Sequence, residues 1–233
     1  MLTLQEPEGT ETKIHPLPRQ ASELRRLLEM KERQLEEARE LLNEVNHRAK
    51  NSLQMAMAML SMQALASESL EVSEALGAAS QRLGYLARVH ELLYKRGDDV
   101  QAIDIAEFLQ DIVNALACAF ERPEIRVTVQ APSLMLSTSQ AINVALIAGE
   151  ALLNSYKYAF PEVRSGNVLV RLSAAGNDAR LEISDDGVGF ASDVRKGSLG
   201  MRLLRALGRA LGGETAVSGT GGTSVAVEFP VSG

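Results

Sequence analysis

The chain has 233 residues, of which 45% are hydrophobic and 23% charged, so wholesale disorder is excluded and one large or two small domains are expected. The formal net charge of −6 argues against a protein that coats nucleic acid. No apolar run approaches the length of a membrane helix, and the N-terminus lacks the pattern of a signal peptide. A single cysteine, Cys118, excludes an internal disulfide. We therefore expect a soluble cytoplasmic protein without membrane insertion.

Residues 1–20 contain three prolines and many polar residues, which predicts a flexible leader that is too short for a sensory domain. The stretch 21–67 has neither glycine nor proline. Within it, apolar positions follow an a/d heptad seam with one polar interruption, which is typical of a coiled coil. An isolated charged helix is the alternative, because three heptads are the lower limit for this pattern. The seam consists of Leu24, Leu28, Lys31, Leu35, Ala38, Leu42 and Val45.

A second amphipathic helix is expected over residues 72–95, closed by the turn-forming residues 97–99. Together the two helices predict a helical hairpin over residues 21–98. A hairpin with apolar faces of this size commonly pairs with a second copy, which gives a dimeric four-helix bundle. The apolar stripe of the second helix is Leu76, Leu83, Leu86, Val89 and Leu93.

The remaining residues, 99–233, alternate between helical and strand patterns. Helices on one layer and strands on the other predict an α/β sandwich, so the whole chain is expected to be an α+β multidomain protein. The turn at Gly176 and Asn177 predicts a β-hairpin. We expect helices at 104–120, 138–159 and 198–211, and strands at 125–129, 167–173, 179–184, 214–218 and 223–229.

Two glycine clusters are candidates for ligand binding. Asp185 ends an expected strand and precedes Gly187 and Gly189, where the backbone can approach a ligand and the carboxylate can accept from an exocyclic amine. An ordinary Asp-Gly turn is the alternative reading. Gly197 and Gly200 lie at the start of the last expected helix, whose amides attract phosphate. Neither cluster has Walker or Rossmann spacing, so a phosphate-binding loop of another kind is required.

The helix expected at 138–159 is apolar apart from a few residues. Glu150 and Asn154 lie four residues apart and share one face, with Lys157 one turn further along. Polar groups on an otherwise buried face are costly without partners. An asparagine oxygen suits Mg²⁺ beside nucleotide phosphates, although each residue taken alone is more commonly solvated.

One histidine has the position expected of a reactive side chain. His47 lies roughly 160–260° around the helix from the seam, and therefore faces solvent. Arg48, Lys50 and Asn51 follow it and can pair with phosphate. His90 instead lies on the apolar stripe of the second helix and is expected to be a core histidine.

Taken together, residues 40–230 resemble the sensor histidine kinases, in a subfamily that has a His-Arg-x-x-Asn box and is related to the His-Trp-Glu kinases. The box corresponds to His47, Arg48 and Asn51. The other motifs of the family are similar to Glu150 through Tyr158 (N box), Asp185-x-Gly187-x-Gly189 (G1), Gly197-Ser-Leu199-Gly200 (G2) and Gly222-Thr223.

The resemblance implies a dimerisation and phosphotransfer hairpin followed by a Bergerat-type ATP-binding domain. It implies that His47 accepts the γ-phosphoryl group in an environment formed by Arg48 and Asn51. It also implies that Asn154 ligates Mg²⁺ and that Glu150 organises metal or water. In the ATP site, Asp185 would hold the adenine amine, Leu199 would belong to the pocket, and Lys157, Gly200 and Thr223 would lie along the phosphates.

Two departures from the family pattern stand out. Arg48 replaces the acidic residue that usually serves as general base beside the histidine, so proton removal could fall to Glu44, to a group of the ATP domain, or to no group. The loop between Gly189 and Gly197 is shorter than a typical kinase lid.

The expected function is an ATP- and Mg²⁺-dependent protein-histidine kinase that passes its phosphoryl group to an aspartate of a response regulator receiver domain. One alternative is a non-catalytic phosphotransfer or docking protein with a vestigial ATP domain. Another is an ATPase or serine kinase of the same nucleotide fold. A signal would arrive through the leader, the coiled coil or a separate sensory protein.

Overall fold

The computed structural model describes residues 17–94, 96, 102–162, 164–190 and 198–231. The chain divides into two compact units, residues 1–49 and 50–233. Most of the expected leader and the expected turn at 97–99 lie outside the described residues. In the described part of the chain, no helix combines the length and the apolar character needed to cross a membrane.

Helix α1 (Leu17–Ala66) runs without a break from the first unit into the second. Its continuity follows from the absence of glycine and proline and from charged pairs one turn apart, such as Arg48 and Glu44, whose Nε and Oε1 atoms lie 2.7 Å apart. Leu28, Leu35 and Leu42 are exposed in the single chain. Within the described part of a single chain, no other segment therefore covers these three leucines of the expected seam.

Helix α2 (Leu70–Tyr94) returns along the final turns of α1 and forms the expected helical hairpin. Ser69 begins α2 by accepting a hydrogen bond from Val72 N at its Oγ. The two helices touch through small side chains, since Ser80 Oγ lies 3.1 Å from Ser61 Oγ and donates to Met57 O at 3.3 Å.

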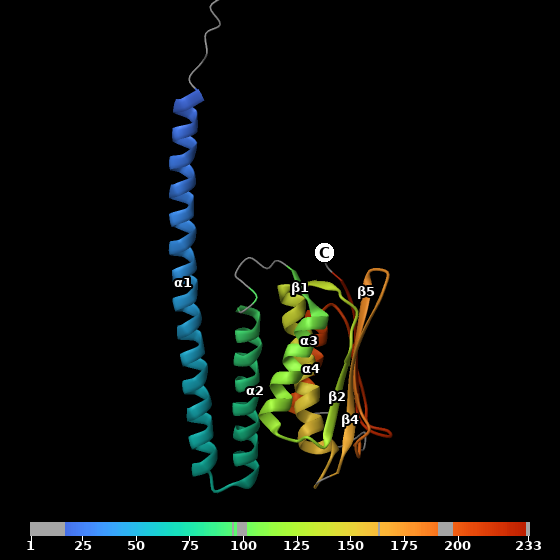
Figure 1. Cartoon of the computed structure of the whole chain (residues 1–233). Coiled ribbons are helices and arrows are strands. Elements are labelled where there is room, and N and C mark those ends of the chain that lie inside the picture. Colours follow the sequence, from blue (N-terminus) through green and yellow to red (C-terminus); the bar gives the residue numbers. More distant parts are fainter. Residues whose placement is uncertain (1–16, 95, 97–101, 163, 191–197, 232–233) are drawn as a thin grey trace, which may run out of the picture. The chain divides into compact units, whose positions relative to one another are not determined.

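The second unit also contains a five-stranded sheet, whose strands lie in the order β2-β4-β5-β7-β6. Strands β2 and β4 are parallel, and all the other neighbours are antiparallel. Helices α3, α4 and α5 cover one face of the sheet, which confirms the expected sandwich (Figure 1). The elements are β2 (Ile125–Gln130), β4 (Gly166–Ala175), β5 (Asp178–Asp185), β6 (Thr215–Ser218), β7 (Ser224–Pro230), α3 (Ile105–Phe120), α4 (Thr138–Asn154) and α5 (Leu199–Ala210).

The structure adds two strands that the sequence pattern did not predict. Strands β1 (Ala102–Asp104) and β3 (Met135–Ser137) pair with each other as a separate antiparallel ribbon. Each has three residues, which is too short for an alternating pattern to be recognised.

The helix expected at 138–159 changes form near its end. The α-helical part ends at Asn154, and a single π-helical turn, η1 (Ser155–Ala159), follows. Arg122 caps this turn by donating to Tyr156 O at 2.8 Å and to Phe160 O at 3.0 Å. π-Helical turns occur frequently at functional sites, because they re-aim the side chains that follow.

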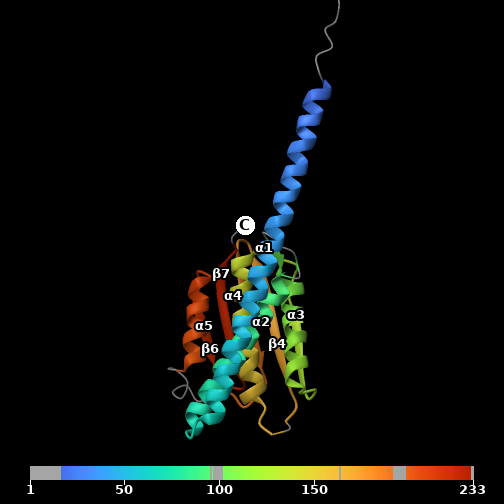
Figure 2. The same cartoon turned by 90° about the vertical axis from the view of Figure 1, so that its left-hand side faces the viewer.

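The buried face of α2 differs from the expected stripe. Its most buried residues are Tyr85, Val89 and Leu92, which join the core formed by α3 and α4. In both views α2 lies beside these helices, on their side away from the sheet (Figures 1 and 2). The expected stripe is confirmed at Val89 and at Leu93, which packs against this core, and was wrong at Leu86, which is exposed. The difference arises because α2 packs against α1 on one side and against α3 and α4 on another. His90 is half-buried instead of fully buried, and its ring lies 4.6 Å from that of Tyr94.

Candidate functional site

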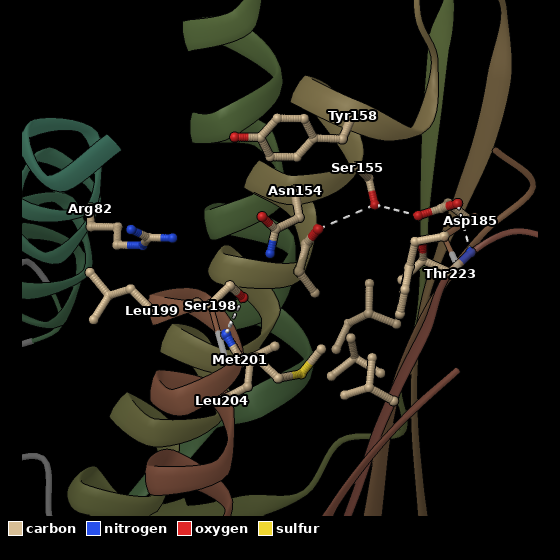
Figure 3. A pocket seen from close by; sticks show the side chains of 16 residues that line it. Arg82, Asn154, Ser155, Tyr158, Asp185, Ser198, Leu199, Met201, Leu204 and Thr223 are labelled. Atoms are coloured by element: carbon tan, nitrogen blue, oxygen red, sulfur yellow. Dashed lines mark hydrogen bonds between the residues drawn. The ribbon is translucent and has the colours of Figure 1, made fainter. Parts of the chain in front are cut away.

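A pocket of about 270 Å³ opens between α4, the start of α5 and strands β5, β6 and β7. Asn154 and Ser155 lie on one side of it, and Asp185 and Thr223 lie at one end (Figure 3). Arg82, from α2, lies toward the opposite end. The rest of the lining is mainly apolar, including Ile183, Met201, Leu204, Val217 and Val225. A flat organic group with a polar edge would suit such a lining.

The carboxylate of Asp185 is held by three donors. Its Oδ1 atom accepts from Thr223 N at 2.9 Å and from Gly187 N at 3.1 Å. Its Oδ2 atom accepts from the hydroxyl of Ser155 at 2.8 Å. A carboxylate has about four acceptor positions, so this buried group keeps one for a ligand in the pocket.

The backbone conformation of the loop after Asp185 requires a glycine at position 189. Gly189 has a φ of 63°, and a Cβ atom there would lie 2.1 Å from the carbonyl oxygen of Gly219. The next residue, Phe190, donates its N–H to the same oxygen at 3.2 Å. These contacts hold the loop that follows β5 against the loop between β6 and β7, whose Thr223 binds Asp185.

A buried ion pair lies at the opposite end of the pocket. Arg82 donates from Nε to Glu150 Oε2 at 2.8 Å and from Nη2 to Glu150 Oε1 at 2.7 Å. The side chain of Glu150 is only 3% exposed. A Cβ atom at Gly200 would lie 2.3 Å from Oε1, so the absence of a side chain there lets α5 begin directly against the pair.

Lys157 lies within electrostatic reach of this pair. Burial and the neighbouring positive charge of Arg82 lower the pKa of the Lys157 ammonium, while Glu150 partly opposes the shift. Arg82 and Lys157 therefore place two cations near one acidic group. The local positive excess would suit an anion.

The structure brings together most of the residues expected to form the ATP site. Asn154, Asp185, Leu199, Gly200 and Thr223 all line one pocket. Gly187 donates to Asp185, and Gly189 shapes the adjoining loop. Gly197 lies outside the described residues.

Thr223, which was expected along the phosphates together with Lys157 and Gly200, lies beside Asp185. Its backbone N–H donates to Asp185, at the far end of the pocket from Arg82 (Figure 3). The reason is the register of β5 against β7, which brings the residue before Ser224 level with the end of β5.

The expected phosphoacceptor box lies on α1. His47 and Asn51 are exposed, and His47 belongs to the first compact unit whereas the pocket belongs to the second. Arg48 is paired with Glu44 on the solvent-exposed surface of the helix, so both side chains have a partner other than His47.

Four polar residues of the pocket were given no role by sequence reasoning: Arg82, Ser155, Tyr158 and Ser198. Ser155 follows Asn154 directly, so the polar interruption of an apolar helix was a usable signal. The sequence signal for Arg82 was weak, because it consisted only of a positive charge on the helix of the hairpin that has fewer charged residues. Its relation to Glu150 depends on contact between segments 68 residues apart.

Two family models match the sequence, one described as histidine kinase over residues 44–120 and one as histidine kinase-like ATPase domain over residues 122–227. The chain is similar to blue-light-activated histidine kinase 2 of Erythrobacter litoralis (strain HTCC2594), with 33% identity over 82% of this chain and 57% of that protein. It is also similar to sensor histidine kinase PdtaS of Mycobacterium tuberculosis, with 28% identity over 71% of this chain and 34% of that protein.

Among solved structures, the histidine kinase domain of a blue-light-activated histidine kinase from Erythrobacter litoralis matches with a TM-score of 0.60 and 27% identity. The match covers 78% of this chain and 96% of that domain. The chain thus spans between a third and somewhat more than half of the curated relatives, and nearly all of a solved kinase domain.

Proposed function

The chain belongs to the histidine kinases, and from this membership we propose that it is an ATP-dependent protein-histidine kinase that phosphorylates itself on His47. The phosphoryl group would then pass to an aspartate of a response regulator receiver domain. The observation that carries this proposal is the pocket that ends at Asp185. A fixed carboxylate there faces an apolar cavity whose other end is cationic, as a purine nucleotide with a phosphate chain requires.

The pocket residues fit a nucleotide in a defined direction. The remaining acceptor position of Asp185 suits the exocyclic amine of adenine, and the apolar lining suits its ring. The phosphates would then extend toward Gly200, Lys157 and Arg82.

The residues at the phosphate end also suit Mg²⁺. Asn154 offers an amide oxygen beside the pocket, and Glu150 offers a carboxylate close to it. A magnesium ion usually takes one or two such ligands beside substrate phosphates. When bound, it would supply charge neutralisation on the phosphates. In this arrangement Asn154 orients the ion, while the π-helical turn that follows keeps Ser155 on Asp185.

At the phosphoacceptor, the chemistry requires positioning more than covalent assistance. A neutral imidazole nitrogen of His47 attacks the γ-phosphorus, the bond from that phosphorus to the β–γ bridging oxygen breaks, and ADP leaves. The other ring nitrogen then releases its proton. Because Glu44 is paired with Arg48, we propose that the proton passes to solvent.

We further propose that the kinase acts as a homodimer through the hairpin. Leu28, Leu35 and Leu42 are between 43% and 56% exposed, and they follow the heptad seam. Beyond the seam, Met55, Met59 and Met62 leave a further apolar surface on α1. An exposed apolar surface as long as this one on α1 usually marks a site of association with another protein surface, here a second copy of the chain.

The test is incubation with γ-labelled ATP and Mg²⁺, followed by mapping of the labelled residue. An acid-labile phosphoryl group on His47 is expected, absent in His47→Ala and greatly reduced in Asn154→Ala. A purified receiver domain should remove the label, whereas its Asp→Asn variant at the phosphoacceptor should not. Label retained by His47→Ala, or an acid-stable phosphoprotein, would contradict the assignment.

A further inference from the structure

Arg82 is the one side chain of α2 among the described residues that lines the pocket. It extends from the hairpin toward α4 (Figure 3). Two of its N–H groups bind the two oxygens of Glu150 there. The G2 glycine, Gly200, lies against the same pair. Arg82 is therefore placed at the meeting point of α2, α4 and α5.

The backbone that carries Arg82 is anchored by the next turn of α2. Tyr85 is buried, and its hydroxyl donates to the carbonyl oxygen of Ala145 on α4. Val89 and Leu92 continue this buried face one and two turns further along. Since residues three and four apart share a helix face, this anchor directs Arg82 toward α4.

The guanidinium keeps donors available after it binds Glu150. An arginine has five N–H donors, and the pair with Glu150 accounts for one on Nε and one on Nη2. The side chain is 25% exposed and lines the pocket. The N–H groups on Nη1 can therefore donate to a ligand in the pocket, while the two hydrogen bonds to Glu150 fix the orientation of the guanidinium plane.

The charge at this end of the pocket favours an anion as that ligand. Burial, and after it the neighbouring positive charge of Arg82, lowers the pKa of Lys157, so two cations share this end of the pocket with one carboxylate, Glu150. A phosphate chain would relieve this repulsion and accept the fork of donors that Arg82 presents.

We propose that Arg82 is a phosphate-binding residue of the nucleotide site, supplied by the hairpin helix α2 and oriented by Glu150. This inference rests on the proposed function, since it takes ATP as the ligand. It implies that the ATPase domain alone lacks part of the site. It also implies that binding of a nucleotide with a full phosphate chain strengthens the contact between α2 and α4.

The test compares ligands that share adenine but differ in phosphates. Adenosine, ADP and ATP are titrated into the full chain by calorimetry, in Mg²⁺-free buffer so that no metal contact through Glu150 contributes. Arg82→Met should weaken ATP binding about tenfold or more, as expected for a lost charge-assisted hydrogen bond, and leave adenosine within about twofold of wild type. Arg82→Lys should recover part of the loss. The matched control is Arg88→Met, also on α2, where the arginine pairs with Glu91 on the surface.

Glu150→Gln separates direct binding from an indirect effect. If Arg82 contacts phosphate, Glu150→Gln should keep or increase ATP affinity, because the amide oxygen can still accept from the guanidinium and hold it in place, while a negative charge beside the phosphates is removed. If Arg82 acts only by neutralising Glu150, Glu150→Gln should weaken ATP binding as Arg82→Met does, and that result would overturn the inference. Equal losses for adenosine and ATP in Arg82→Met would overturn it too, because the defect would then not concern phosphate.

The outcome for the wild-type chain distinguishes this inference from the proposed function. If wild type binds ATP and labels His47 while Arg82→Met behaves like wild type, the inference alone fails. If wild type shows no saturable binding of ATP, the proposed function fails and the inference fails with it.

Discussion

The ring of Tyr85 on α2 occupies the space that a side chain at Gly149 on α4 would need. A Cβ atom at Gly149 would lie 1.9 Å from Cζ of Tyr85. The missing side chain lets the ring lie flat against α4 and lets its hydroxyl reach the carbonyl oxygen of Ala145. The close approach of Tyr85 to α4 thus depends on one glycine.

Gly149→Ala should destabilise the protein. The added methyl group forces the buried ring out of place, and overpacking of this kind costs about 1–3 kcal/mol. The midpoint of urea unfolding should fall accordingly. Gly77→Ala is the control, because no atom lies within 4 Å of its added methyl group, and the better helix former should raise stability by about 0.5–1 kcal/mol. A Gly149→Ala variant as stable as Gly77→Ala would contradict the packing argument.

Asp185→Asn should weaken ATP binding while the protein stays folded. The amide can still accept from Thr223 N and Gly187 N and can donate to Ser155, but the charged acceptor for the adenine amine is lost. A decrease of about tenfold or more in affinity is expected by calorimetry.

The neighbouring carboxylate offers a control for that change. Asp186 accepts hydrogen bonds from the backbone and the side chain of Asn167 and takes no part in holding Asp185. Asp186→Asn should therefore bind ATP as wild type does. If both variants bind equally well, the adenine end of the pocket has been assigned to the wrong residue.

Lys157 should take up protons when ATP binds at alkaline pH. Burial and Arg82 lower its pKa in the free protein, so part of the population is neutral at a pH below the ordinary lysine value of 10.5. Phosphate nearby favours the charged form and raises the pKa, so binding draws a proton from the buffer. Near neutral pH the lysine is charged in both states, and no uptake from it is expected.

The measurement is the enthalpy of ATP binding at about pH 9.5 and at about pH 7, in buffers that differ in their enthalpy of ionisation. The slope should report proton uptake at the higher pH only, and Lys157→Met should abolish it. Proton release, or an unchanged slope in Lys157→Met, would mean that Lys157 does not face the phosphates.

Leu35→Glu should abolish the dimer. The substitution puts an unpaired charge into the heptad seam, where burial without a partner is strongly unfavourable. Light scattering should give twice the single-chain mass of 25.1 kDa for the wild type and the single value for the variant. Leu41→Glu is the matched control, since Leu41 is as exposed in the single chain but lies outside the seam. A wild type that is monomeric at micromolar concentration would refute the dimer itself.

Periodicity and motif spacing were sufficient for the order of the main elements and for some of the residues at the pocket. The run without glycine or proline predicted α1, and the alternation around Gly176 predicted the β4–β5 hairpin. Glu150, Asn154 and Asp185 were identified because a polar side chain on an apolar face, or a carboxylate followed by glycines at a strand end, is a local signal that neighbouring residues reveal.

The tertiary structure decided everything that depends on contact between distant segments. The partner of Glu150 is on α2, the partner of Asp185 is Thr223 directly before β7, and neither pairing leaves a trace in local sequence. The face that α2 buries was predicted only in part, because a helix with two packing neighbours carries two overlapping apolar stripes. Short strands such as β1 and β3 form only when another segment supplies their hydrogen bonds, so the fold, and not the local pattern, creates them.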